Sequence, residues 1–179
     1  MLQQLPNALT LSRLLLALPL GLLILREQFA WALALGFIAG VTDALDGFAA
    51  RRLGAFSRLG SILDPVADKT LIMITFLSLA HTGLIPWPLA LLVLARDLVI
   101  VCGAAIYHRL FGPFEFSATL LSKANMGIQI AFCVLVLAAQ LLNLPEQLLV
   151  LAGALVIFIA LASGIDYVLT WSRKALQQK

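Results

Sequence analysis

Four aspartates lie within apolar segments that otherwise carry almost no charge, and they come in two pairs. Asp43 and Asp46 are three residues apart near the end of one segment, and Asp64 and Asp68 are four residues apart at the start of the next. On helices, both spacings place the two carboxylates of a pair on one face. A short basic turn joins the segments, so the helices would run antiparallel and the two pairs could face each other near that turn.

Four converging carboxylates repel one another unless a cation neutralises them. Sites built only from oxygen ligands suit hard divalent ions such as Mg²⁺, Mn²⁺ or Ca²⁺. The alternative is that an aspartate pairs with an arginine of the turn, Arg51, Arg52 or Arg58. Carboxylates inside membrane segments are costly and usually functional, so four of them at helical spacing favour a metal site over separate ion pairs.

The composition is that of an integral membrane protein. Of the 179 residues, 62% are hydrophobic and 12% are charged, and the mean hydropathy is +1.03. Soluble domains carry about 25% charged residues. We therefore expect one all-α membrane domain over residues 1–179, with the first apolar run retained because no small-residue cleavage site follows it. Cys102 and Cys133 lie inside apolar runs and indicate neither a disulfide nor a metal site.

Six apolar segments are each close to the roughly 20 residues that a spanning helix needs. They cover approximately residues 8–25, 29–50, 61–80, 89–107, 117–142 and 147–171. The loops between them form a nearly neutral group and a basic group, and the basic group comprises Arg51, Arg52, Arg58, His108, Arg109, Arg173, Lys174 and Lys179. The positive-inside rule predicts that the basic loops, both termini and the aspartate pairs are cytoplasmic. The expected location is a bacterial inner membrane, with the site facing the cytoplasm.

The stretch from Asp43 to Asp68 also resembles a known signature. Its spacing, D-x2-D-G-x2-A-R-x8-G-x3-D-x3-D, is similar to the complete signature of the CDP-alcohol phosphotransferases. The matching residues are Asp43, Asp46, Gly47, Ala50, Arg51, Gly60, Asp64 and Asp68. No signature position departs from the pattern, and the resemblance extends less specifically over nearly the whole chain.

The resemblance implies a reaction and a set of roles. A CDP-linked lipid, commonly CDP-diacylglycerol, would bind, an alcohol would attack the phosphorus attached to the lipid, and CMP would leave. The four aspartates would hold two divalent ions, Mg²⁺ or Mn²⁺, and Asp68 would take the proton of the alcohol. The nucleotide-contacting positions would be Gly47, Ala50, Arg51 and Gly60. The family is similar in being dimeric, so we expect a homodimer, with no nucleic-acid partner.

The residues themselves are consistent with these roles but leave alternatives open. Two metal ions a few ångströms apart can clamp a phosphoryl group. Gly47 and Ala50 would let a ligand approach the helix backbone, although small residues in membrane helices also mark helix packing. Arg51 suits bidentate contact with a diphosphate, and it could equally be a basic residue that fixes the membrane topology.

The acceptor alcohol is less well indicated. Arg96 could reach an acceptor phosphate or could simply neutralise Asp97, and Lys123 and Arg109 could line the cytoplasmic mouth or extend to lipid headgroups. Family members differ in acceptor, phosphatidylglycerol or glycerol 3-phosphate. The runs LIPWPLALLVLARDLVIVCGAAIYHR and LLSKANMGIQ, with Asp97 after Arg96, favour phosphatidylglycerol.

Acidic residues in membrane helices also build divalent-cation transporters. A transporter would need its carboxylates near the middle of the membrane, on a path open to both sides. In this sequence they gather towards one side, opposite nearly neutral loops. Polytopic prenyltransferases use aspartate-rich metal sites as well, but they lack the spacing to Gly60 and are longer chains.

Overall fold

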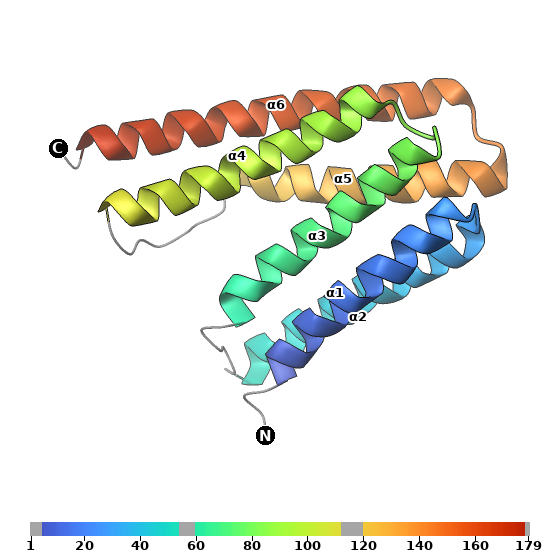
Figure 1. The fold of residues 1–179 in the computed structure, drawn as a ribbon, viewed down its shortest axis with the longest axis horizontal. Coiled ribbons are helices and arrows are strands. Elements are labelled where there is room, and N and C mark those ends of the chain that lie inside the picture. Colours follow the sequence, from blue (N-terminus) through green and yellow to red (C-terminus); the bar gives the residue numbers. More distant parts are fainter. Residues whose placement is uncertain (1–4, 54–59, 112–119, 178–179) are drawn as a thin grey trace. The chain divides into compact units, whose positions relative to one another are not determined.

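All the regular secondary structure of the described residues is α-helical. The computed structural model describes the backbone of residues 5–53, 60–111 and 120–177, and the side chains of residues 15–42, 68–103, 109 and 121–170. Within these ranges there are six helices and no strand (Figure 1). They are α1 (Leu5–Leu25), α2 (Phe29–Leu53), α3 (Gly60–His81), α4 (Trp87–Phe111), α5 (Leu120–Leu142) and α6 (Glu146–Gln177). The prediction of an all-α protein is confirmed.

Each predicted apolar segment corresponds to one helix, but several helices continue into polar sequence. His108 and Arg109, which we expected in a loop, lie in the last turn of α4. Helix α6 runs to Gln177, past the end of its apolar run. Polar residues do not end a helix by themselves, and basic side chains are favourable at a helix C-terminus. The apolar pattern therefore gives the length of the apolar part of a helix rather than its full length.

Two of the turns are closed by the same hydrogen-bonded motif. After α1, Glu27 has a positive φ of 57°, its N–H donates to the carbonyl of Ile24, and the N–H of Gln28 donates to that of Leu23. After α3, Gly83 has a φ of 75°, and Leu84 donates to the carbonyl of Leu79. This left-handed cap satisfies carbonyls that a helix end would leave free. It reverses the chain within a few residues.

The chain divides into two compact units, and α5 contributes to both. Unit 1 comprises Met1–Ile85 and Val136–Leu144, and unit 2 comprises Pro86–Leu135 and Pro145–Lys179. Unit 1 therefore contains α1, α2, α3 and the end of α5. Unit 2 contains α4, α6 and the first part of α5.

In unit 1, helix α1 packs against both α2 and α3. Its buried face carries Ala17, Leu20 and Ile24, at the spacing of successive helical turns. Phe76 on α3 is fully buried in the same unit. The helices approach closely at Gly21, where an added Cβ would lie 2.6 Å from Ile74 Cγ2 of α3.

In unit 2, helix α4 packs against α6 along its length (Figure 1). Near the start of α6, a Cβ added at Gly153 would lie 3.2 Å from Leu89 Cδ1 of α4 and 3.8 Å from the ring of Phe132 of α5. Further along, the hydroxyl of the buried Tyr167 donates a hydrogen bond to the carbonyl of Ile100 at 3.1 Å. These contacts hold α6 against both neighbours within the unit.

The outer surface is strongly apolar where side chains are described. Large hydrophobic side chains are exposed on several helices, among them Trp31, Phe37, Leu151 and Phe158. Two helical stretches, Leu121–Leu142 and Glu146–Thr170, are long and apolar enough to cross a membrane. The apolar stretches described in α1 and α2, Leu15–Leu25 and Phe29–Thr42, are shorter. A membrane protein is plausible on these grounds, and six spans remain a prediction.

The close approach of α1 and α3 gives a first testable prediction. Gly21→Ala should lower the free energy of unfolding by about 1–3 kcal/mol, because the Cγ2 of the β-branched Ile74 cannot move away without a shift of the helix. Gly40→Ala is the matched control, since an added Cβ there meets nothing within 4 Å of the described residues. That control should be neutral or stabilising by up to about 1 kcal/mol. Thermal unfolding in mild detergent measures both, and equal stability of the two variants would contradict the packing.

Candidate functional site

The structure places all eight signature residues on two helices of unit 1. Helix α2 contains Asp43, Asp46, Gly47, Ala50 and Arg51, and α3 contains Gly60, Asp64 and Asp68. Because the backbone is helical at both pairs of aspartates, each pair has the spacing of neighbours on one helix face. Helix α1 packs against both α2 and α3, so it supports both halves of the signature.

The side chains of residues 43–67 lie outside the described part of the structure, so most of the predicted metal and nucleotide contacts stay predictions. Asp68 is described, and it is half-buried on α3. Among the described side chains, no three Asp, Glu, His or Cys residues form a group that could hold a metal ion. What supports a metal at the signature is its set of donors, four carboxylates at helical spacing on two helices of one unit, which suits hard divalent ions.

A buried charged residue lies in the middle of unit 2. Arg96 of α4 is 8% exposed, and its Nη1 donates to Asp97 Oδ1 at 2.6 Å. Its Nη2 donates to Ser122 Oγ of α5 at 3.2 Å and also to Ser163 Oγ of α6. One guanidinium thus joins three helices. Its Nε is buried and has no hydrogen-bond partner among the described residues.

The ion pair explains how unit 2 tolerates this charge. A buried guanidinium is costly unless a carboxylate and further hydrogen bonds compensate for the lost hydration. Asp97 supplies the opposite charge and the two serines supply acceptors. The two alternatives expected for Arg96 are therefore compatible, because the pairing with Asp97 leaves Nε available as a donor. The geometry directly supports the pairing of Arg96 with Asp97, and contact of Arg96 with an acceptor phosphate stays a proposal.

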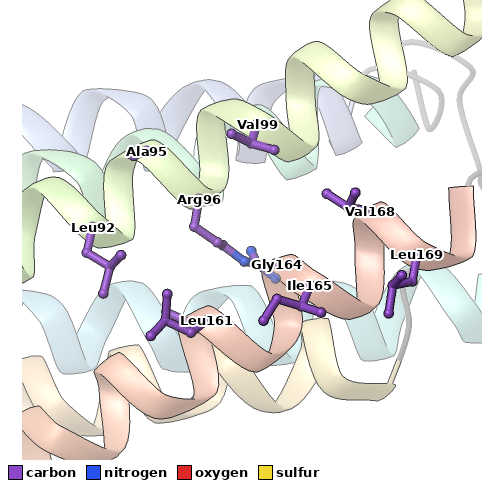
Figure 2. A pocket seen from close by; sticks show the side chains of 10 residues that line it. Leu92, Ala95, Arg96, Val99, Leu161, Gly164, Ile165, Val168 and Leu169 are labelled. Carbon is purple, nitrogen blue, oxygen red and sulfur yellow. The ribbon is translucent and has the colours of Figure 1, made fainter. Parts of the chain in front are cut away.

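An apolar groove lies beside Arg96, between α4 and α6 (Figure 2). Its volume is about 390 Å³, within the range of small-ligand pockets. It is lined by Leu92, Ala95, Arg96, Val99, Ala160, Leu161, Gly164, Ile165, Val168 and Leu169. The side chain of Arg96 extends from α4 towards Gly164 of α6, and a Cβ added at Gly164 would lie 3.7 Å from Arg96 Cγ. Among the described residues that line the groove, only Arg96 is charged.

The other two candidate acceptor residues lie at the surface. Arg109, near the end of α4, and Lys123, near the start of α5, are both exposed. Neither takes part in the hydrogen bonds that surround Arg96. Exposed basic side chains at these positions suit contact with anionic headgroups or with a ligand entering from solution.

Sequence reasoning missed the polar residues that accompany Arg96 inside unit 2. Ser122 and Ser163 bind its guanidinium, while Asn125 and Gln129 of α5 are each 1% exposed. A signal was present in the run SKANMGIQ, where Ser122, Asn125 and Gln129 follow one another at helical spacings of three and four residues. Three polar residues on one face of an apolar helix indicate an interior polar stripe.

Comparison with known proteins shows one family over most of the chain. Residues 3–167 match the family described as CDP-alcohol phosphatidyltransferase. The chain is 36% identical to a cardiolipin synthase (CMP-forming) of Rattus norvegicus over 96% of its own length. It is also 36% identical to a protein of that name from Streptomyces coelicolor over 74% of its length, and 33% identical to a probable phosphatidylglycerophosphate synthase of Mycobacterium tuberculosis over 92%.

The relatives differ in how much of their own length the chain matches. The matched region covers 62% of the rat protein, 65% of the Streptomyces protein and 79% of the mycobacterial one. The family match over residues 3–167 includes the signature, α4, α5 and most of α6. The matches to the single relatives leave out part of each relative.

Proposed function

The chain belongs to the CDP-alcohol phosphatidyltransferase family, and from that premise we propose that it transfers a phosphatidyl group from CDP-diacylglycerol to phosphatidylglycerol, forming cardiolipin and releasing CMP. The observation that carries this proposal is the complete signature on α2 and α3, at the spacing of the family. The acceptor is supported by the relatives named cardiolipin synthase (CMP-forming), which align with 96% and 74% of the chain.

A second acceptor has support of its own. The mycobacterial relative is named a probable phosphatidylglycerophosphate synthase and aligns with 92% of the chain. If the chain shares that activity, its acceptor is glycerol 3-phosphate. Both acceptors present a glycerol hydroxyl and a phosphate group, so the two proposals differ in whether the acceptor carries acyl chains.

The proposed reaction assigns a task to each signature residue. Asp43, Asp46, Asp64 and Asp68 would hold two divalent ions, Mg²⁺ or Mn²⁺, and such ions would stabilise the negative charge that develops on the leaving phosphate. The nucleotide and its diphosphate are bound by Gly47, Ala50, Arg51 and Gly60. Asp68 accepts the proton of the acceptor hydroxyl, whose oxygen forms the new bond to phosphorus. The bond from that phosphorus to the bridging oxygen breaks, and CMP leaves with the electron pair.

The acceptor is bound, on this proposal, by basic residues outside the signature. Arg96 contacts the acceptor phosphate through the Nε that has no partner among the described residues. The exposed Arg109 and Lys123 attract the anionic headgroup towards the site. Arginine suits this role because its guanidinium stays charged when it is buried.

We further propose that the six helices span a bacterial inner membrane with both termini and the active site at the cytoplasmic face. The basic loops and the two stretches long enough to span support this orientation. The protein is proposed to act as a homodimer with one site in each protomer, since apolar side chains remain exposed on several helices. A monomeric mass in both mild detergent and lipid nanodiscs would contradict the dimer.

Product identification tests the proposed reaction. Purified protein with CDP-diacylglycerol, Mg²⁺ and phosphatidylglycerol should form cardiolipin and CMP in equal amounts, and Asp64→Asn should abolish both because it removes a proposed metal ligand. The lipids are separated and identified by mass. Formation of phosphatidylglycerophosphate from glycerol 3-phosphate, with no cardiolipin, would show that the acceptor is glycerol 3-phosphate and not phosphatidylglycerol. Activity of Asp64→Asn equal to that of the unmodified protein would reject the site.

A second experiment separates the roles of two aspartates on α3. Asp68→Asn should keep the affinity for CDP-diacylglycerol within about threefold but lower turnover by roughly 10²–10⁴, the usual contribution of a positioned general base. Asp64→Asn should weaken metal and nucleotide binding together. Nucleotide-lipid affinity and turnover are measured for both variants at saturating metal. An equal loss of substrate binding in the two variants would make Asp68 chiefly a ligand.

Labelling of introduced cysteines tests the orientation. Single cysteines replace Arg58, between α2 and α3, and Thr82, at the end of α3, in a background with Cys102 and Cys133 changed to serine. In intact cells, a membrane-impermeant reagent should label the cysteine at 82 and should label the one at 58 only after the membrane is opened. Labelling of both from the same side would disprove the six-span arrangement.

A further inference from the structure

Two buried amide side chains of α5 have polar atoms without partners. Asn125 and Gln129 are each 1% exposed. Both amide atoms of Asn125, Nδ2 and Oδ1, and Nε2 of Gln129 form no hydrogen bond with any described residue. Burying an amide without a partner costs about 1–3 kcal/mol, and the large majority of buried side-chain polar atoms in proteins bond to protein or to ordered water. These atoms therefore point to a polar partner that the described residues do not supply.

The two amides share a helix face with a residue that binds Arg96. Ser122 accepts a hydrogen bond from Arg96 Nη2 at 3.2 Å. Asn125 lies three residues after Ser122 and Gln129 lies four residues after Asn125, so the three form one stripe along α5. The stripe extends about 10 Å along the helix, at 1.5 Å per residue. Together with Nε of Arg96, the stripe gives unit 2 three donor atoms and one acceptor atom that have no hydrogen-bond partner within the described part of the chain.

We propose that Asn125 and Gln129 bind the glycerol hydroxyl groups of the acceptor, next to the phosphate contact of Arg96. This inference rests on the proposed function and names the residues that would select its acceptor. The chemistry of the amides favours hydroxyl groups over an anion, because an amide presents both a donor and an acceptor and a hydroxyl group offers the same two. An anion would leave Asn125 Oδ1 without a donor.

Such a site would select for the hydroxyl groups themselves. A site built to hydrogen-bond a hydroxyl group strongly rejects an analogue that lacks it, because the buried polar groups of the protein are then left unpaired. A phospholipid with a propanol headgroup has the same phosphodiester and acyl chains as phosphatidylglycerol, but it lacks both free glycerol hydroxyls. It should bind poorly although it can reach Arg96 equally well.

Near-isosteric apolar variants separate ligand binding from a structural role. Asn125→Leu and Gln129→Met remove the polar atoms while keeping similar side-chain volumes, and Gln140→Met is the matched control on an exposed glutamine of the same helix. Without ligand, the first two variants should unfold at the same temperature as the unmodified protein or higher, because buried polar atoms that have no partner among the described residues are replaced by apolar ones. A merely structural amide would give the opposite shift.

Kinetics and binding complete the test. Asn125→Leu and Gln129→Met should raise the KM for phosphatidylglycerol by about 10-fold or more, the equivalent of one lost hydrogen bond to a buried group, and should leave the KM for CDP-diacylglycerol within about twofold. In nanodiscs, the unmodified protein should bind phosphatidylglycerol at least about 10-fold more tightly than phosphatidylpropanol, and Asn125→Leu should lose this preference. Gln140→Met should change none of these values.

Other outcomes are equally decisive. If Asn125→Leu fails to fold, or unfolds at a lower temperature with an unchanged acceptor KM, the amides are structural or hold a water molecule, and the inference is wrong. If the unmodified protein uses only glycerol 3-phosphate, the proposed acceptor is wrong. The proposed hydroxyl site is then tested by comparing the affinity of the protein for glycerol 3-phosphate with its affinity for propyl phosphate, which lacks the hydroxyl groups. Loss of that preference in Asn125→Leu would support the site, and an unchanged preference would overturn it.

Discussion

The cost of placing charge in apolar surroundings is the constraint on which the rest of this protein depends. Only 12% of its residues are charged, yet six charges lie on helices that are otherwise largely apolar: Asp43, Asp46, Asp64, Asp68, Arg96 and Asp97. A charge in such a place must be neutralised, or the helices that carry it will not pack. Arg96 shows one solution, an ion pair with Asp97 completed by two serines. For the four aspartates of α2 and α3, we propose the other solution, divalent metal ions.

The two units carry different parts of the proposed chemistry. Unit 1 presents the signature on α2 and α3, and α1 supports both helices through closely packed positions such as Gly21. Unit 2 contains Arg96, the polar stripe of α5 and the apolar groove between α4 and α6. On this proposal, the residues that bind the donor and those that bind the acceptor lie on separate sets of helices. Such a division would let family members keep the signature and change the acceptor.

Much of the fold could be predicted because it depends on local sequence. Long apolar runs interrupted by turns predicted the six helices found in the described ranges, and Gly83 marks a turn that needs a positive φ. The partners of Arg96 could not be predicted, because Ser122 and Ser163 are 26 and 67 residues away along the chain. Only the packing of α4, α5 and α6 brings them together. The predicted segments stop short of Phe111 in α4 and of Gln177 in α6, because both helices continue through polar residues that a search for apolar runs does not detect.

The central claim, that the four aspartates hold metal, is tested most directly by measuring metal binding itself. Free Mn²⁺ is followed by electron paramagnetic resonance as it is titrated into the purified protein in nanodiscs. The account predicts two bound ions per chain in the unmodified protein, strong loss of binding when Asp43 or Asp64 is changed to asparagine, and competition by Mg²⁺. Equal Mn²⁺ binding by the unmodified protein and by a variant with all four aspartates changed to asparagine would contradict it.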